Sequence, residues 1–281
     1  MRIEMKRKLL WITLMLLGTL NLNSDEFIGI IKPINDVKVS VPLDGVVESI
    51  YVKEGSYVKK GQKVLKLENR LQQLELNRRK IIWKDKAQLN ASIKNQEIQE
   101  ALLASTQELY EQTKAVSQQE LQLLESKLYT LKGEIAMRRE NEKKEKVEYQ
   151  IANKLLSKYL IKSPINGVVI EMGLQKGEWA KAGKPFVRIV NEDVCYIDIN
   201  IDETYSSKLK VGNKIDFTVQ TKSVTAKKKG KIIFISPVAD MASGLVRIKV
   251  EFSNRKNRVT PGLSATINID KFSKNRVKDL K

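Results

Sequence analysis

Residue types that commonly catalyse reactions or bind metals are nearly absent from this chain. It contains no histidine and one cysteine, Cys195. This composition excludes the usual zinc sites, Ser-His-Asp and Cys-His catalysis, and an internal disulfide bond. Cys195 lies in the alternating run VCYIDINI, which predicts a small side chain buried in a strand. The six methionines are scattered, which argues against a thioether copper site, so we expect no catalytic residue, metal or cofactor.

The position with the clearest local role is Ser117, in the stretch Ser117-Gln118-Gln119-Glu120. This spacing is a capping box, in which the serine hydroxyl and the glutamate side chain satisfy free amide groups at a helix start. The helix predicted to follow carries a coiled-coil seam, because apolar residues recur at alternating intervals of three and four. The seam consists of Leu121, Leu124, Leu128, Leu131 and Ile135.

This helix belongs to a helical insertion predicted over residues 70–158. From Arg70 to Ser157 the chain has one glycine, Gly133, and no proline, and it is rich in Leu, Glu, Gln, Lys and Ala. We expect two antiparallel arms of about 45 and about 40 residues, which would make a rod about 60–65 Å long. The first arm carries a looser apolar stripe: Leu71, Leu74, Ile82, Leu89, Ile93, Leu102 and Leu109.

A charged stretch, residues 138–146 (RRENEKKEK), interrupts the predicted seam. Mixed charges at helical spacing are typical of a solvated face with ion pairs between residues four apart. A surface that docks a neighbouring copy of the chain is the alternative interpretation.

The insertion separates two copies of one pattern, residues 40–69 and 162–191. They align without a gap at a constant offset of 122 residues, as from Pro42 to Pro164. Two similar half-units around one insertion cannot each bury a core, so we expect them to fold onto each other. Glycines stand at matching places, and we predict tight turns with positive φ at the last two of each copy. These turn glycines are Gly45, Gly55 and Gly61 in the first copy, and Gly167, Gly177 and Gly183 in the second.

The rest of the chain is predicted to be rich in strands. Residues 192–270 contain the alternating runs YIDINI, KIDFTV, KGKIIFI, LVRIKVEF and SATINI, with turns at Gly212 and Gly262. Five or six short strands of this kind suit a small barrel. The tail, residues 271–281, is basic and polar.

The N-terminal 24 residues have the pattern of an export signal. Lys6, Arg7 and Lys8 precede an apolar run from Leu9 to Leu20. The run is shorter than the roughly 20 residues that span a bilayer, so we predict a signal peptide or signal anchor over residues 1–24. The net charge of +18 is spread along the chain and only 6% of residues are aromatic, so nucleic acid is not predicted as a partner.

The paired half-motifs beginning P-x-x-G-V-V resemble the two halves of a lipoyl-like barrel-sandwich domain. With the inserted hairpin and the following ISPVAD…RIKVEF…PG pattern, the chain resembles the periplasmic adaptor subunits, or membrane fusion proteins, of tripartite bacterial efflux pumps. The resemblance implies a multidomain, mainly β protein with a long α-helical coiled-coil hairpin. The expected parts are a split lipoyl-like barrel-sandwich hybrid (37–69 and 159–191), the hairpin (70–158) and a small β-barrel (192–270).

The resemblance also implies transport rather than catalysis. Such adaptors stack into rings, with six copies expected here, and bridge an inner-membrane transporter to an outer-membrane channel in the periplasm of a double-membrane bacterium. A proton-driven RND transporter that exports drugs or other small toxic compounds fits best, because the predicted rod is modest in length. The adaptor of an ATP-driven (ABC) exporter or type I secretion system is the alternative. The N-terminus or the transporter would hold the adaptor at the inner membrane.

Two partner surfaces follow from the resemblance. The hairpin tip would contact the outer-membrane channel through Thr106, Tyr110, Lys114, Ala115, Val116, Ser117 and Gln118. Many members carry Arg, Leu and Ser there at fixed spacing, whereas this chain keeps Ser117 but has Tyr110 and Thr106 at the leucine and arginine places. The β-barrel would face the transporter with a basic loop, for which a solvated hairpin is the alternative. That loop contains Lys227, Lys228, Lys229 and Lys231.

An alternative function is a lipoyl or biotinyl carrier domain of an enzyme. Such a domain would need a modifiable lysine between the two halves, where this chain has Glu68-Asn69-Arg70-Leu71.

Many adaptors also add a membrane-proximal β-domain after the barrel. Eleven residues follow Asp270, so that domain would be absent or would use residues 27–38.

Overall fold

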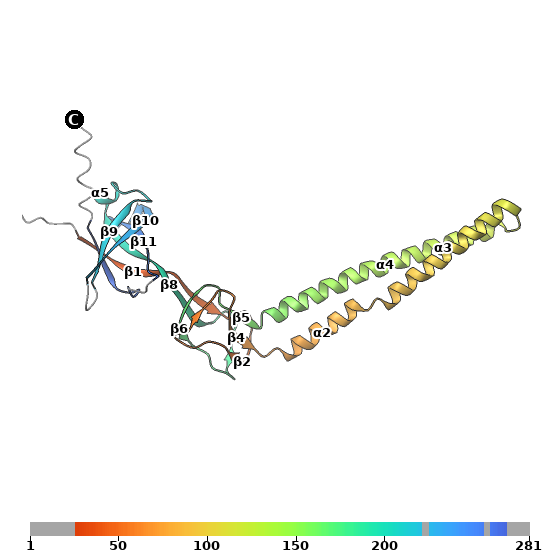
Figure 1. Cartoon of the computed structure of the whole chain (residues 1–281), viewed down its shortest axis with the longest axis horizontal. Helices are drawn as coiled ribbons and strands as arrows, with labels where there is room; N and C mark the ends of the chain where they lie inside the picture. Colours follow the sequence, from red (N-terminus) through yellow and green to blue (C-terminus); the bar gives the residue numbers. More distant parts are fainter. Residues whose placement is uncertain (1–25, 221–224, 256–258, 269–281) are drawn as a thin grey trace, which may run out of the picture. The chain divides into compact units, whose positions relative to one another are not determined.

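The computed structural model describes residues 26–220, 225–255 and 259–268 (Figure 1). The predicted export signal (1–24) and basic tail (271–281) therefore lie outside the described residues. The chain divides into two compact units. The first contains residues up to 37, 165–170 and those from 189 onward, and the second contains 38–164 and 171–188.

Six strands of the first unit close into a barrel. Their order is β1, β12, β9, β10, β11 and β8, and β1 also pairs with β8, which completes the ring. All five predicted runs are strands, and β1 is the sixth, so the prediction of a small barrel is confirmed. The bounds are β1 Glu26–Ser40, β8 Pro185–Asp202, β9 Lys214–Gln220, β10 Thr225–Ala239, β11 Leu245–Ser253 and β12 Ser264–Asn268; the short helix α5, Glu203–Ser206, follows β8.

The barrel core follows the alternation of apolar residues along its strands. Ile197, Ile199 and Ile201 of β8 are buried in it, because every second residue of a strand points to the same face. Cys195 is also fully buried there, as predicted, and burial raises the pKa of its thiol to about 11. Residues 26–30 of β1 pair with β12, so this segment is part of the barrel sheet.

The second unit unites the two sequence copies. The strand order of its sheet is β5, β4, β2 and β7, and β2 of the first copy pairs with β7 of the second, with Val46 opposite Trp179. Equivalent backbone bonds recur: Gly61 N–H donates to Ser163 O (2.8 Å), and Gly183 N–H donates to Val41 O (2.9 Å). The predicted union of the two halves is therefore confirmed. The strands of the two copies are β2 Gly45–Ile50, β3 Tyr57–Val58, β4 Lys63–Leu67, β5 Leu160–Lys162, β6 Gly167–Met172 and β7 Trp179–Ala180. Of these, β6 lies beside β8 in the larger sheet, and its residues up to 170 belong to the first unit.

The repeated glycines have two different structural roles. Gly55, Gly61, Gly177 and Gly183 have φ values of 81°, 85°, 88° and 76°, a region that favours glycine. Gly45 and Gly167, which were also expected in turns, instead begin strands β2 and β6. A Cβ at Gly167 would lie 2.3 Å from Val190 O, so close packing rather than a turn requires glycine there.

The inserted hairpin consists of three helices. The first arm contains α2 (Arg70–Lys84) and α3 (Ala87–Thr113), and both pack against the single helix of the second arm, α4 (Gln118–Ser157) (Figure 1). We did not predict the break at Asp85 and Lys86. Asp85 has extended backbone, and its Oδ1 accepts a hydrogen bond from Ala87 N–H at 3.0 Å, which satisfies one of the free amides at the start of α3.

The seam between the arms was predicted correctly on one side only. All five predicted seam residues of α4 are buried or half-buried, with Leu128 and Ile135 the most enclosed. The first-arm stripe was wrong in large part, because Leu71, Leu74, Ile82, Leu102 and Leu109 are exposed. A two-helix coil buries only a narrow strip, and α3 fills it with a different heptad series. That series is Leu89, Ser92, Gln96, Gln99, Leu103, Thr106 and Tyr110.

Candidate functional site

The hairpin tip is built by two helix ends joined over residues 114–117. Lys114 ends α3 with φ of 56°, and its Nζ lies 4.2 Å from the centre of the Tyr110 ring. Ser117 begins α4, and its hydroxyl accepts a hydrogen bond from Glu120 N–H at 3.1 Å, which is the serine half of the predicted capping box. The tip is therefore held by local bonds that leave most of its side chains free to meet a partner.

The predicted channel-contact residues differ in exposure. Lys114, Ala115, Ser117 and Gln118 are exposed, and Val116 is half-buried. Thr106 and Tyr110 are also half-buried and belong to the heptad series of α3. Thr106 Oγ1 also donates to the backbone carbonyl of Leu102 at 2.8 Å. The exposed part of this predicted site is therefore confined to the turn itself.

The charged stretch of α4 does not interrupt the seam, contrary to the sequence-based interpretation. Arg138, Glu142 and Glu145 continue the heptad series of α4 and are half-buried. Arg138 Nη1 donates to Gln88 Oε1 at 2.7 Å, and Lys86 Nζ lies 2.6 Å from Glu142 Oε1. These contacts lie at the break in the first arm. The intervening positions, such as Lys143 and Lys144, are exposed, as expected for a solvated face.

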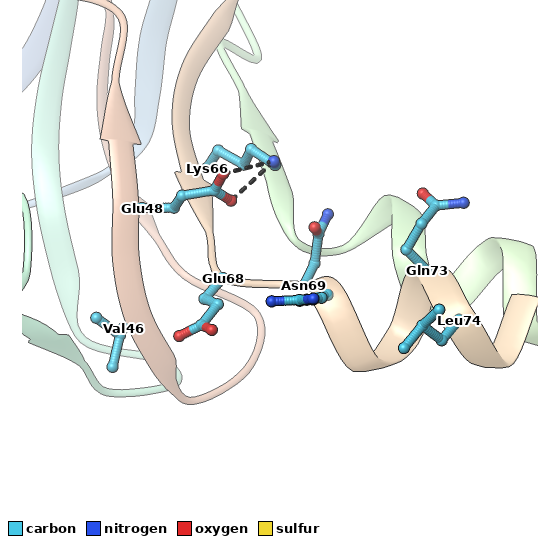
Figure 2. A pocket seen from close by; sticks show the side chains of 8 residues that line it. Val46, Glu48, Lys66, Glu68, Asn69, Gln73 and Leu74 are labelled. Carbon is cyan, nitrogen blue, oxygen red and sulfur yellow. Dashed lines mark hydrogen bonds and ion pairs between the residues drawn. The ribbon is translucent and has the colours of Figure 1, made fainter.

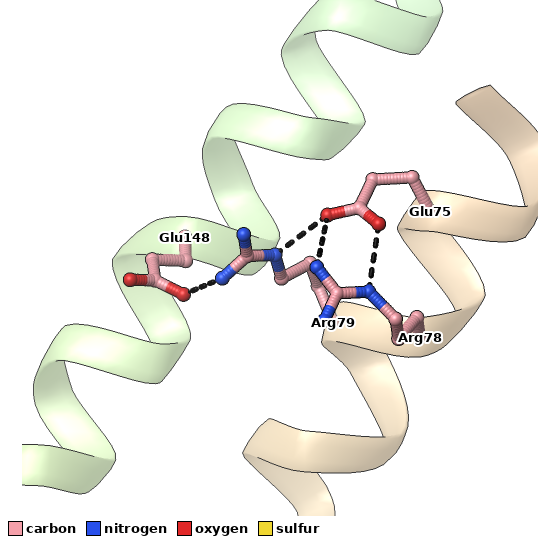
Figure 3. Close-up of polar contacts among 4 residues, drawn as sticks. All are labelled: Glu75, Arg78, Arg79 and Glu148. Carbon is pink, nitrogen blue, oxygen red and sulfur yellow. Dashed lines mark hydrogen bonds and ion pairs between the residues drawn. The ribbon is translucent and has the colours of Figure 1, made fainter.

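Ion pairs also join α2 to α4 nearer the β-strands. Figure 3 shows Arg79 of α2 between Glu75 of its own helix, at 2.8 Å, and Glu148 of α4. Arg78 reaches the same Glu75 with two bonds of 2.8 Å. Hydrogen bonds from Arg78 and Arg79 lower the pKa of Glu75 to about 2, so this cluster stays charged over the physiological range.

Large apolar side chains lie on the outside of the hairpin. On α2 these include Leu71 and Ile81, whose exposed fractions are 75% and 71%. On α4 they include Val147 and Ile151, which are also exposed. They face away from the seam, because α2 turns Leu76 and Trp83 toward α4, where Trp83 stacks on Tyr149 at 5.1 Å. Exposed apolar stripes of this kind are typical of surfaces that bind another protein.

A hollow of about 530 Å³ lies where β4 leads into α2 (Figure 2). Val46 and Leu74 line it together with charged groups, and Lys66 Nζ is held by Glu48 at 2.8 Å. The connection itself contains Glu68 and Asn69 rather than a lysine. The hollow therefore lacks the free lysine that a lipoyl or biotinyl carrier would present at this place.

The predicted basic loop is part of a strand. Lys227, Lys229 and Lys231 lie on β10 and point outward, and Lys231 is paired across the ladder with Lys214 on one side. Lys228 points the other way, where its Nζ donates to Asn254 Oδ1 at 3.3 Å. A loop was expected from the charge run, but exposed lysines alternate with the less exposed Ala226, Lys228 and Gly230, as in a strand whose outer face is basic.

Two features are absent from the described residues: a metal-binding cluster and a membrane-spanning helix. Over these ranges, no group of three or more His, Cys, Asp or Glu side chains is arranged to hold a metal ion. In the same part of the chain, no helix combines the length and apolar character needed to cross a membrane.

Comparison with known proteins matches this geometry to a family. Residues 40–190 match the model for the YknX barrel-sandwich hybrid domain, and residues 196–273 match that for the CusB-like β-barrel domain. The chain belongs to the membrane fusion protein family of periplasmic adaptors. The resemblance drawn from the half-motifs and the hairpin is confirmed, as is the expected fold class.

Two solved structures are similar over most of the chain, and one relative is similar over a shorter part. The crystal structure of MacA from Actinobacillus actinomycetemcomitans is 25% identical with a TM-score of 0.73, covering 87% of this chain and 78% of that one. Spr0693 from Streptococcus pneumoniae R6 is 16% identical with a TM-score of 0.56, covering 85% of this chain and 98% of that one, and shares the fold. YhbJ of Bacillus subtilis, named as an efflux system component, is 26% identical over 124 residues, or 39% of this chain and 56% of that protein.

Proposed function

We propose that this membrane fusion protein is the periplasmic adaptor of an efflux pump and links an inner-membrane transporter to an outer-membrane channel. The observation that carries the proposal is the hairpin. Its helix α4 runs unbroken for 40 residues, which corresponds to about 60 Å. A projection of this length with a largely exposed end is suited to reach a second protein. This end, formed by the turn 114–117 and Gln118, is the proposed contact with the channel.

The outer faces of the hairpin support self-association into a ring, for which we propose six copies. The exposed apolar residues of α2 and those of α4 belong to two helices that pack against each other, so they provide two separate surfaces. Two different surfaces that meet head to tail generate a closed ring when the rotation between copies closes. Burial of Leu71 and Ile81 against the Val147 and Ile151 side of the next copy would remove these apolar side chains from water.

The proposed transporter is of the proton-driven RND type, with export of drugs or other small toxic compounds. The modest hairpin supports this choice over a type I secretion system, whose adaptors usually have longer hairpins. The basic outer face of β10, with Lys227, Lys229 and Lys231, is the proposed transporter-facing surface. Residues 1–24 would act as signal peptide or anchor in a double-membrane bacterium, and an ATP-driven exporter remains the alternative partner.

The test is complementation of a gene deletion with a shortened hairpin. Removal of residues 92–105 and 122–135 takes two heptads from each arm, keeps the seam in phase and keeps the tip intact. The hairpin would become about 21 Å shorter. We expect the deletion strain to be hypersensitive to detergents, dyes and antibiotics, and expect the intact gene, but not the shortened one, to restore resistance.

Two outcomes would change the proposal. Full rescue by the shortened protein would show that the reach of the hairpin is not needed, and it would overturn the bridging role. Unchanged sensitivity of the deletion strain together with loss of a secreted protein from the medium would instead indicate the adaptor of an ATP-driven secretion system. A proton uncoupler that abolishes efflux while cellular ATP is maintained would support the RND assignment.

A further inference from the structure

A pocket of about 370 Å³ is lined mainly by the second sequence copy, and the proposed pump function does not use it. Its apolar lining comes from Val41 of the first copy and from Leu174, Pro185 and Phe186 of the second. The indole of Trp179 forms another wall and is 60% exposed. A volume of this size is within the range of small-molecule sites, roughly 300–1,000 Å³.

The internal repeat explains why the pocket is open in one copy. At the offset of 122 residues, Gly173 corresponds to Tyr51 of the first copy. The backbones are equivalent, because Tyr51 N–H donates to Val64 O at 2.9 Å and Gly173 N–H donates to Phe186 O at 2.7 Å. The first copy therefore places a tyrosine side chain where the second copy places none.

The glycine at position 173 is not required by the backbone. Gly173 is not among the glycines with positive φ. The nearest atom to an added Cβ would be Phe186 O at 3.5 Å, which is an ordinary contact. Neither the backbone conformation nor crowding requires glycine at position 173. The effect of Gly173 is therefore to leave the pocket open, because no side chain fills it. Pro185 replaces Lys63, whose Nζ in the first copy lies 6.0 Å from the centre of the Tyr51 ring, so a second covering side chain is also missing.

The rim of the pocket is positively charged. Lys181 and Lys184 line it, and no carboxylate is among its lining residues. Nearby carboxylates accept backbone hydrogen bonds. Asp44 Oδ1 accepts from Ala182 N–H at 2.7 Å, and Glu178 Oε2 accepts from Gln175 N–H at 2.9 Å. Glu54 Oε1 accepts from Met172 N–H at 2.9 Å. Two ammonium groups beside an apolar hollow favour a ligand with complementary charge and an apolar body.

We propose that this pocket binds a small amphiphilic anion, with its apolar body against Trp179 and Phe186 and its carboxylate, sulfate or phosphate between Lys181 and Lys184. The indole face supplies apolar contact area at little cost in side-chain entropy. The two lysines supply charge at the rim, where an anionic group can remain partly hydrated. This inference stands independently of the bridging role, because it depends on no partner protein.

Calorimetric titration of the full chain with decanoate, below its critical micelle concentration, tests the proposal. We expect saturable binding at one site, and affinities for decanol and for decyltrimethylammonium that are lower by about tenfold. Gly173→Tyr should remove this binding while circular dichroism stays native, because the first copy carries tyrosine at the equivalent place. Lys181→Gln should abolish the preference for decanoate over decanol, whereas the matched change in the first copy, Lys59→Gln, should have no effect.

Several results would overturn the proposal. These are binding that Gly173→Tyr leaves unchanged, equal affinity for the anion, the alcohol and the cation, or an equal effect of Lys59→Gln and Lys181→Gln. If Gly173→Tyr does not fold, Trp179→Ala replaces it and should weaken decanoate binding by about tenfold. Binding only to vesicles of anionic lipid, with none to monomeric decanoate, would assign the charge effect to a membrane surface and would also overturn the pocket.

Discussion

Asp198 and Arg247 form a two-pronged ion pair on neighbouring strands of the barrel, with Nε–Oδ1 and Nη2–Oδ2 distances of 2.6 Å each. Lys32 of β1 adds a third bond to the same carboxylate at 2.7 Å. The side chain of Asp198 is only 11% exposed. One carboxylate therefore links β1, β8 and β11, including the two strands that complete the ring of the barrel.

This ion pair predicts a pH-dependent stability. The hydrogen bond from Arg247, followed by the contact with Lys32, lowers the pKa of Asp198 from 3.8 to about 2. Because the folded-state pKa is lowered, the stabilisation is present above about pH 4 and is lost as the pH falls toward about 2. Asp198→Asn should lower the free energy of unfolding by about 1–2 kcal/mol near neutral pH, since both cations are half exposed. Hydrogen exchange of the amides in β8 and β11 measures this loss of stability. An equal loss in Asp198→Asn at about pH 4 and at about pH 2 would show that the ionised carboxylate is not its cause.

The two glycines that begin β2 and β6 should respond differently to substitution. A Cβ at Gly167 would lie 2.3 Å from Val190 O, whereas one at its counterpart Gly45 would lie 3.6 Å from Leu67. We expect Gly167→Ala to cost more than about 2 kcal/mol of folding free energy, and Gly45→Ala to cost less than about 1 kcal/mol. Urea unfolding of the two variants is the comparison, and similar midpoints would show that the close approach of Gly167 is easily relaxed.

The hairpin seam predicts which leucine and isoleucine positions matter for helix stability. Ile135 is 3% exposed on the seam, whereas Leu123 on the same helix is 70% exposed. Ile135→Ala should destabilise the hairpin by about 2–4 kcal/mol, and Leu123→Ala by less than about 0.5 kcal/mol. Thermal melts followed by helical circular dichroism report on the hairpin, because the long helices of the described residues all belong to it. A larger loss of stability in Leu123→Ala than in Ile135→Ala would show that the seam lies on the other face of α4.

Ser117 allows capping to be separated from contact with the channel. Ser117→Asp keeps a side-chain oxygen for the amide of Glu120 and should leave helix stability unchanged, whereas Ser117→Ala should cost about 1 kcal/mol. Ser117→Arg adds bulk and charge at the tip and should abolish efflux while circular dichroism and expression stay normal. Normal efflux with Ser117→Arg would count against docking of the channel at the tip. If efflux instead decreases only in the variants that lose helix stability, the role of Ser117 is structural.

The repeat and the barrel could be predicted from sequence because their signals are local and strict. The glycines and the P-x-x-G-V-V half-motifs recur at one constant offset, and each barrel strand alternates apolar and polar residues. The first arm of the hairpin was harder, since its leucines and isoleucines lie on more than one face. Its buried positions include Ser92 and Gln99, which hydropathy does not mark as a core. The break at Asp85 has no proline or glycine, so only the aspartate before a new helix could have indicated it.

The candidate sites also differ in whether a local sequence signal predicts them. Ser117 was recognisable from the spacing of a capping box, whereas the contacts of Lys86 and Arg138 depend on the register between two arms. The pocket beside Trp179 was within reach of the sequence, because aligning the copies places Gly173 against Tyr51. The pocket itself depends on how Pro185 and Phe186 pack beside Trp179, which the sequence alone does not show.

The division of one domain into two sequence segments has a consequence for the order of folding. Residues 41–67 cannot complete their sheet until Trp179 and Ala180 of the second copy have emerged from the ribosome. Closing a flexible loop over the intervening residues, about 110 in number, would cost about 4 kcal/mol of chain entropy. If the two helical arms of the hairpin pair first, they bring Glu68 and Tyr159 near each other. Most of the entropy cost of closing the loop is then removed. Variants that weaken the seam should therefore slow the assembly of the β-sandwich, although they change none of its own residues.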